Sequence, residues 1–144
     1  MSEPIVEELD RDECLRLLGT QVVGRLAVAE PGEAPHLLPV NYTVLRESVV
    51  FRSSPGTKLR LLVDEPVAFE ADSFDPDGRT GWSVTVRGRA YEASDREMEI
   101  EDIRLPAFVE RQNSRWVRLV PESVTGRRIV RPSSTAEKLG APGG

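Results

Sequence analysis

The sequence of 144 residues predicts a mainly β protein, in which six or seven strands form a small antiparallel barrel with two or three short helices. Apolar and polar residues alternate along most of the chain, which is typical of strands with one buried face. The connections between these segments are mostly short and rich in Pro, Gly and Asp. A parallel doubly wound sheet would instead need a helix between most strands.

Length and composition are those of a single domain. The hydrophobic content of 39% is ordinary, and the chain is long enough for one core. We expect residues 1–9 to be a frayed N-terminal lead-in, residues 10–130 to be the folded domain, and residues 131–144 to be a flexible tail, because the tail lacks a core pattern.

Composition also argues against several classes of protein. No run of about 18 apolar residues occurs, so no membrane span is expected. The N-terminus has no secretory pattern and the lone Cys14 cannot form an intramolecular disulfide, so we expect a cytoplasmic protein. One His and one Cys make a metal site unexpected. The net charge of -5, without aromatic residues interleaved among the arginines, argues against nucleic-acid binding.

The first predicted element of the domain is a short helix. Asp10 and Glu13 have the spacing of a capping box, and the apolar residues after them stop at Gly19. Cys14 lies within this segment. We expect it to be a small core residue rather than a nucleophile, since no histidine is near in sequence.

Two strands are expected next, at residues 22–29 and 36–45, joined by a turn-rich hairpin connection. In the second strand, Val40 and Tyr42 share a face, and Asn41 lies on the other. Pro39 cannot donate a ladder hydrogen bond, so the strand should have an edge or a break there. A strand edge or break exposes backbone N–H and C=O groups, which could form hydrogen bonds with a flat heteroaromatic ring.

A third strand then leads into a helix start, and we call residues 53–58 the strand-to-helix corner. Four groups there could surround the orphan N–H groups of the helix start and bind a phosphate dianion: the hydroxyls of Ser53, Ser54 and Thr57 and the ammonium of Lys58. The only other lysine is at position 138, in the expected tail, so Lys58 is the single lysine of the expected folded domain. This suggests that a compact ammonium is needed at this position. An ordinary Pro-Gly turn with Thr57 as N-cap would fit the same residues.

The rest of the domain continues the alternation. Residues 66–74 form a strand whose inward residues are Val67, Phe69 and Ala71, and residues 80–93 form the longest strand, suited to a barrel or a subunit interface. Ser94 opens a second capping box, from which a helix should run to about Leu105. Residues 115–120 form a sixth strand, which residues 124–130 extend.

The ordered motifs resemble the flavin-binding split barrels related to pyridoxamine 5'-phosphate oxidase, in the subgroup that includes nitroimidazole-resistance reductases. The resemblance covers residues 10 to about 130 and rests on four segments: Pro39-Val40-Asn41-Tyr42, Phe51-Arg52-Ser53-Ser54-Pro55-Gly56-Thr57-Lys58, Pro66-Val67-Ala68-Phe69-Glu70 and Gly81-Trp82-Ser83-Val84-Thr85-Val86-Arg87-Gly88-Arg89-Ala90. It implies a six- to seven-stranded antiparallel split β-barrel.

The resemblance also implies a homodimer with two flavin mononucleotides (FMN) at its interface. Ser53, Thr57 and Lys58 match positions that bind the phosphate. Val40 and Asn41 match the strand along the isoalloxazine ring. A further strand should approach the cofactor from the same or the partner subunit, through Trp82, Ser83 and Val84. Arg52 stands where the nitroimidazole-reductase relatives often have His, a departure that bears on nitroimidazole reduction more than on flavin binding.

The function expected from these residues is an FMN-dependent oxidoreductase that passes electrons from NAD(P)H to a small organic acceptor. No side chain is assigned a general acid or base role. Related split barrels bind a 5-deazaflavin coenzyme through a similar corner, so this coenzyme is the alternative cofactor. A carrier or sensor that binds flavin without turnover is the alternative of a different class.

Overall fold

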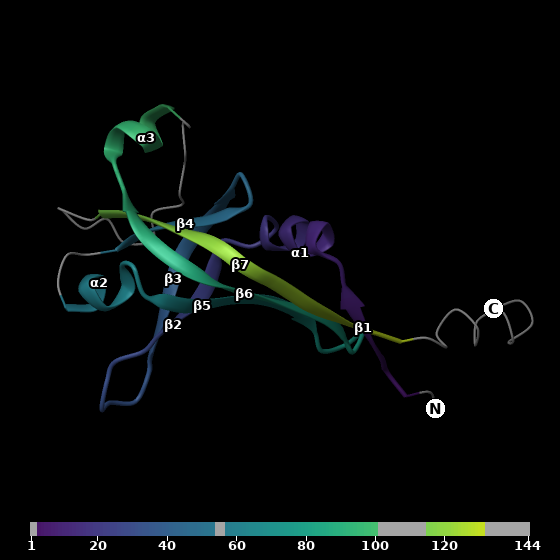
Figure 1. Cartoon of the computed structure of the whole chain (residues 1–144). Coiled ribbons are helices and arrows are strands. Elements are labelled where there is room, and N and C mark those ends of the chain that lie inside the picture. Colours follow the sequence, from purple (N-terminus) through teal and green to yellow (C-terminus); the bar gives the residue numbers. More distant parts are fainter. Residues whose placement is uncertain (1–2, 54–56, 101–114, 132–144) are drawn as a thin grey trace, which may run out of the picture.

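The computed structural model describes residues 3–53, 57–100 and 115–131. This part of the chain contains seven strands and three helices (Figure 1). In chain order they are β1 (Ile5–Leu9), α1 (Arg11–Leu18), β2 (Val23–Val28), β3 (His36–Leu45), β4 (Ser48–Ser53), α2 (Thr57–Leu62), β5 (Pro66–Asp75), β6 (Thr80–Ala93), α3 (Asp95–Ile100) and β7 (Arg115–Val130).

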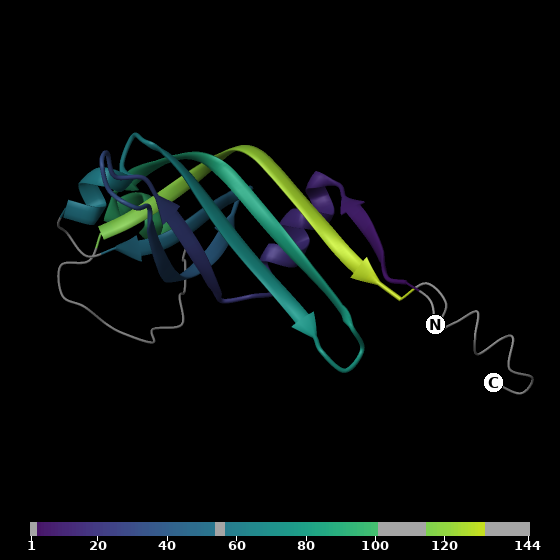
Figure 2. The ribbon, with the colours of Figure 1, turned by 90° about the horizontal axis from the view of Figure 1, so that it is seen from below.

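The strands form a closed antiparallel barrel, as the sequence predicted. The hydrogen-bonded order is β7-β4-β3-β2-β5-β6, and β6 pairs with β7 to close the ring. β1 adds one strand outside the ring, on β7. Figure 2 shows α1 and β1 beside the end of β7, and α2 and α3 towards its beginning.

β7 is one strand rather than a strand with a separate extension. Its first residues lie between β4 and β6, and residues from Gly126 onward lie between β1 and β6. The register with β6 shifts where Arg87 pairs with Ser123 and Gly88 pairs with Pro121, which leaves Glu122 as the extra residue of a β-bulge. The bulge bends β7. On the side away from β6, the first part of β7 pairs with β4 and its last part pairs with β1.

The N-terminal lead-in is more ordered than we expected, because Ile5–Leu9 is a strand. Ile5 and Val6 are 46% and 57% exposed, so β1 has no buried face that a hydrophobic pattern could indicate. Its pairing with β7 from Val130 to Gly126 supplies the order through backbone hydrogen bonds. The lead-in therefore contains a strand. The predicted boundary at residue 9 between the lead-in and the folded domain stays a prediction.

The core fills the barrel, and the inward residues are those that the alternation predicted. Val67, Phe69 and Ala71 are at most 5% exposed. Helix α1 covers one end of the barrel with three buried side chains, Cys14, Leu17 and Leu18. Cys14 is a core residue, as expected, and burial raises the pKa of its thiol.

Side chains cap the predicted helix starts. The Asp10 carboxylate accepts a hydrogen bond from the Glu13 N–H at 2.8 Å, and the Ser94 hydroxyl accepts one from the Glu97 N–H at 3.1 Å. Helix α3 packs on the outside of the barrel, where Met98 joins a second buried cluster with Val50, Ala93 and Trp116. Its expected continuation to Leu105, and the predicted tail, lie outside the described residues.

The described helices include none with the length and apolar character needed to cross a membrane. The expected cytoplasmic location stays a prediction.

Tyr42 links the barrel wall to the helix at its end. The side chain is 1% exposed, its ring packs edge-on against Phe69 with centroids 4.8 Å apart, and its hydroxyl donates to the Leu18 C=O at 2.6 Å. Burial raises the pKa of the Tyr42 hydroxyl, so it stays a donor across the physiological range.

Tyr42→Phe is expected to destabilise the protein by about 1 kcal/mol, because the Leu18 C=O loses the shorter of its two hydrogen bonds and keeps only the one from the Gln21 N–H at 3.3 Å. Urea denaturation measures the effect. The matched control is Tyr91→Phe, since the Tyr91 hydroxyl makes only a 3.4 Å hydrogen bond to Glu97 and is half-buried. A loss in Tyr42→Phe no larger than in the control would contradict this role.

Candidate functional site

The first part of β3 presents a strand edge beside the end of β4. Pairing between these strands begins at Tyr42 and Phe51, so that among the described strands His36–Asn41 pair with β2 alone. The Tyr42 N–H donates to the Val22 C=O on the β2 side, at 3.1 Å. Because backbone groups alternate along a strand, those of Pro39 and Asn41 point away from β2. The edge that Pro39 predicted is confirmed.

The predicted site residues of β3 and β4 flank the first pair of these strands. Val40 and Asn41 directly precede Tyr42 on β3, and Arg52 and Ser53 directly follow its partner Phe51 on β4. Ser53 ends β4, and helix α2 begins at Thr57, as the sequence predicted. Residues 54–56 and the side chains of Thr57 and Lys58 lie outside the described part of the chain. Phosphate binding at the strand-to-helix corner therefore stays a prediction.

Helix α2 is held against the barrel beyond the corner. Leu62 is 2% exposed, and the Asp64 N–H donates to the Ala90 C=O of β6 at 2.8 Å. The Arg89 guanidinium donates to the Asp64 C=O at 2.9 Å. These contacts fix the C-terminal end of α2 to a barrel strand.

Arg52 lies on the opposite face of β4 from Ser53. Its guanidinium carbon is 4.8 Å from the ring centroid of Trp116, a cation–π contact outside the barrel. Trp116 is the cross-strand partner of Arg52 on β7. Sequence reasoning treated the two residues separately, since only barrel closure brings β4 beside β7.

Trp82, Ser83 and Val84 lie far from the corner within one chain. Arg52 pairs with Trp116, which pairs with Ala93 at the other end of β6. At about 3.3 Å per residue, roughly 30 Å of strand separates that end from Ser83. Figures 1 and 2 both show α2 and the β5–β6 turn at opposite ends of the barrel.

The three residues also divide between the two faces of β6, with Trp82 and Val84 towards the core and Ser83 outward. Val84 is 0% exposed in the core, and Trp82 packs against the core, so Val84 can meet a ligand only through its backbone. Ser83 lines a polar depression of about 490 Å³ on the outer face of the barrel. The other residues of this depression come from β1, β6 and β7: Glu8, Leu9, Thr85, Val124, Thr125, Gly126 and Arg127.

The single histidine belongs to the β2–β3 hairpin. The Nε2 atom of His36 contacts the Glu30 carboxylate, and both side chains are half-buried. This pairing gives His36 a structural partner in the hairpin connection.

Two carboxylates on the outer face share one arginine, a group that the sequence analysis did not identify. Arg25 Nη1 is 3.3 Å from both Glu70 Oε1 and Asp72 Oδ1. Burial, followed by the hydrogen bond with Asp72, raises the pKa of Glu70 to about 7. The alternation of β5 places Glu70 and Asp72 together on its outward face, so the sequence could have predicted the carboxylate pair. It could not have predicted Arg25, because Arg25 lies on another strand, β2.

Stability should fall as pH rises through the titration of Glu70. Between pH 4.5 and about 7 the folded protein holds a proton that the unfolded chain releases, so this contribution is present below pH 4.5 and lost towards pH 7. We expect Glu70→Gln to show a smaller fall in urea midpoint from pH 5 to pH 8 than the wild type. Glu122→Gln, at an exposed ion pair, is the control and should keep the wild-type fall. An unchanged fall in Glu70→Gln would contradict the assignment.

The protein is thus a small antiparallel barrel. One of its strands, β3, has an edge with outward backbone groups, and the next strand, β4, leads into the strand-to-helix corner. The chain belongs to the pyridoxamine 5'-phosphate oxidase family, whose model matches residues 10–128. The family expected from the sequence is thus confirmed.

The chain is also similar to individual proteins. An uncharacterized protein of Mycobacterium tuberculosis is 40% identical over 137 residues, which cover 90% of each chain. The structure of an FAD binding protein from Mycobacterium smegmatis is 34% identical, with a TM-score of 0.68, over 86% of this chain and 98% of that one. An FAD-binding protein from Mesorhizobium loti is 24% identical with a TM-score of 0.72, over 90% of this chain and 100% of that one, a likeness of fold.

Proposed function

We propose that this protein binds a flavin and acts as a flavin-dependent oxidoreductase. The observation that carries the proposal is the β3 edge, where the pairing with β4 begins only at Tyr42 and the Pro39 C=O points away from β2. A flavin ring has an edge of alternating carbonyl and N–H groups, which matches the donors and acceptors of an extended backbone. Family membership and the FAD-binding relative support the same conclusion.

The residues of the chain would bind and orient the ring. Val40 and Asn41 would lie along the ring, and Pro39 would offer its C=O to the polar edge of the ring. Backbone N–H groups near Val40 and Asn41, or the guanidinium of Arg52, would stabilise negative charge on the reduced ring. A bound flavin supplies hydride transfer at N5, and the protein supplies position and electrostatics.

Phosphate binding is assigned to Ser53, Thr57 and Lys58, at the corner that follows β4. FMN is the expected cofactor. The adenylate of FAD or the side chain of a 5-deazaflavin coenzyme would extend from the same corner, and the FAD-binding relative makes FAD a specific alternative.

We further propose that the protein is a homodimer. Trp82, Ser83 and Val84 match a cofactor-facing strand, yet they lie at the opposite end of β6 from the corner of the same chain. A second copy would bring its Ser83 strand to the corner of the first copy. Sedimentation equilibrium of the flavin-loaded protein tests this, and a monomer at micromolar concentration would contradict it.

One preparation tests the cofactor and the activity. Purified protein should show flavin absorbance, and the mass of the released chromophore identifies FMN, FAD or a 5-deazaflavin. Anaerobic NADH or NADPH should bleach the bound flavin, and a quinone or nitro acceptor should restore the colour. Binding without bleaching would favour a carrier or sensor, whereas protein that takes up no added flavin would overturn the proposal.

A further inference from the structure

The polar depression that Ser83 lines lies where β7 has only one neighbouring strand. β4 pairs with β7 only up to Leu119, and β1 pairs with it only from Gly126 onward. Among the described strands, the β7 residues between these two points therefore pair with β6 alone. The depression, of about 490 Å³, lies beside the end of β1 at Leu9. Its volume is in the range of pockets that bind small molecules.

Polar side chains of β6 and β7 line this depression together. Ser83 is the cross-strand partner of Arg127, and Thr85 is the partner of Thr125. Within the part of the chain that the structure describes, the three hydroxyls and the Arg127 guanidinium make no hydrogen bond or ion pair. The depression therefore gathers four groups that can each donate a hydrogen bond to a ligand.

One carboxylate belongs to the same depression. Glu8 is the cross-strand partner of Arg127 on β1, yet the two side chains form no ion pair in the described residues. A guanidinium binds a phosphate through two parallel N–H bonds, and a carboxylate accepts hydrogen bonds from ribose hydroxyls. This combination fits a nucleotide better than a simple anion, which the carboxylate would repel.

The proposed homodimer covers this face of the barrel. The Ser83 strand of one copy would lie at the strand-to-helix corner of the other, so the depression would border the flavin that the other copy binds. A ligand of the depression must then fit between the two copies, next to that flavin. A dinucleotide meets this requirement, because a diphosphate links its two halves.

We propose that the depression of one copy binds the diphosphate and a ribose of a dinucleotide whose other half lies at the flavin site of the second copy. Arg127 would bind the diphosphate, and Glu8 would accept from the ribose hydroxyls. The inference rests on the proposed homodimer and flavin function. Two dinucleotides share this chemistry, FAD as the cofactor and NADH as the electron donor, and the experiment distinguishes them.

The test uses two pairs of ligands that differ by the adenylate half. The apoprotein is titrated with FAD and with FMN by flavin fluorescence. The FMN-loaded protein is bleached anaerobically by NADH and by reduced nicotinamide mononucleotide, and the concentration for half-maximal rate is measured. We expect the dinucleotide to be preferred in one pair, and Arg127→Gln to reduce that preference about tenfold, as for a charge-assisted hydrogen bond. The pair that responds identifies FAD or NADH.

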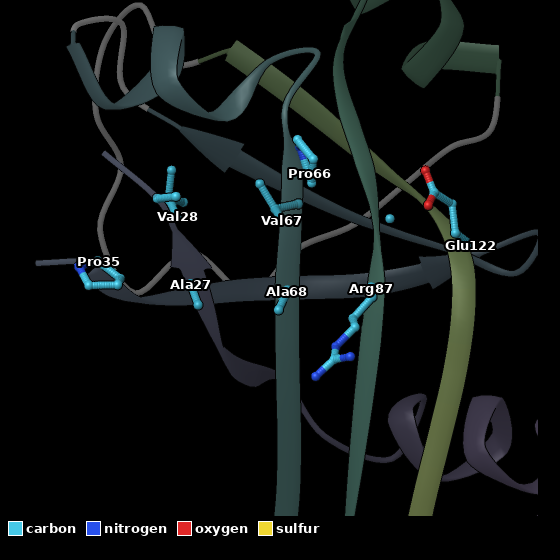
Figure 3. Close-up of a pocket in the computed structure, with 10 residues that line it drawn as sticks. Ala27, Val28, Pro35, Pro66, Val67, Ala68, Arg87 and Glu122 are labelled. Carbon is cyan, nitrogen blue, oxygen red and sulfur yellow. The ribbon is translucent and has the colours of Figure 1, made fainter. Parts of the chain in front are cut away.

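Arg87→Gln is the matched control. Arg87 is also an exposed, outward arginine of β6, but it lines a different hollow, over β2, β5 and β6 (Figure 3). The variant should keep the preference for the dinucleotide. Glu8→Gln should weaken dinucleotide binding by about threefold, whereas a site for simple anions would bind more tightly without the acid.

Several results would overturn the proposal. They are equal affinity for both members of each pair in the wild type, equal losses of preference in Arg127→Gln and Arg87→Gln, or tighter binding in Glu8→Gln. A failure of the depression leaves FMN binding intact. Protein that takes up neither flavin would overturn the proposed function as well, so the two failures are distinguishable.

Discussion

Lys58→Ala is expected to weaken flavin binding by about tenfold to a hundredfold, the range of one hydrogen bond to a charged group. The reason is the assigned contact between the ammonium and the flavin phosphate, which alanine cannot replace with any donor. Titration of the apoprotein with FMN, followed by quenching of the flavin fluorescence, measures the dissociation constant. The urea midpoint of the same variant shows whether the fold is kept.

The control for Lys58 lies on the same helix. Arg60 is exposed in α2, two residues further along, so Arg60→Ala removes one positive charge while leaving the assigned contact in place. Its dissociation constant should stay within about threefold of the wild type, since an exposed charge contributes little. Lys58→Arg should fall between the wild type and Lys58→Ala. Wild-type binding by Lys58→Ala, or equal losses in both alanine variants, would refute the phosphate contact.

The sequence predicted those parts of the fold whose cause is local. Inward residues such as Val67 and Phe69 were identifiable because burial on one face of a strand produces a period of two. Pro39 predicted an edge because it lacks an N–H, and the paired strands show that edge. β1 was missed for a corresponding reason: its order comes from backbone pairing with β7, more than 100 residues away, and leaves Ile5 and Val6 exposed.

The candidate site was predictable only in part. Val40 and Asn41 lie next to the pair Tyr42–Phe51, as Arg52 and Ser53 do on the other strand, because β3 and β4 are consecutive strands, an arrangement that a hairpin pattern implies. Contacts that depend on barrel closure were not readable, such as Arg52 over Trp116 or the Arg25 pairing with Glu70 and Asp72. The separation of Ser83 from the corner likewise follows from the path of β6 around the barrel, which no local pattern encodes.

Gly88→Ala is expected to destabilise the protein by about 3 kcal/mol, at the upper end of the usual cost of overpacking. A Cβ atom at this position would lie 2.0 Å from the Val120 C=O oxygen and 3.1 Å from the Glu122 N atom. Both are backbone atoms of the β7 bulge, so no side chain can rotate away. Relief would require the two longest strands to separate where β7 bends, and urea denaturation measures the cost.

Gly32→Ala separates this clash from the ordinary cost of replacing glycine. Gly32 has a φ of +78° in the β2–β3 connection, and a Cβ atom there would meet nothing within 4 Å. Alanine should therefore cost only about 1 kcal/mol, from the left-handed backbone conformation. If Gly88→Ala lost no more than Gly32→Ala, the close approach of β6 to the bulge would not be a constraint on the barrel. A larger loss at Gly88 means that the bulge, and with it the position of β1 and of the Ser83 strand, depends on a residue without a side chain.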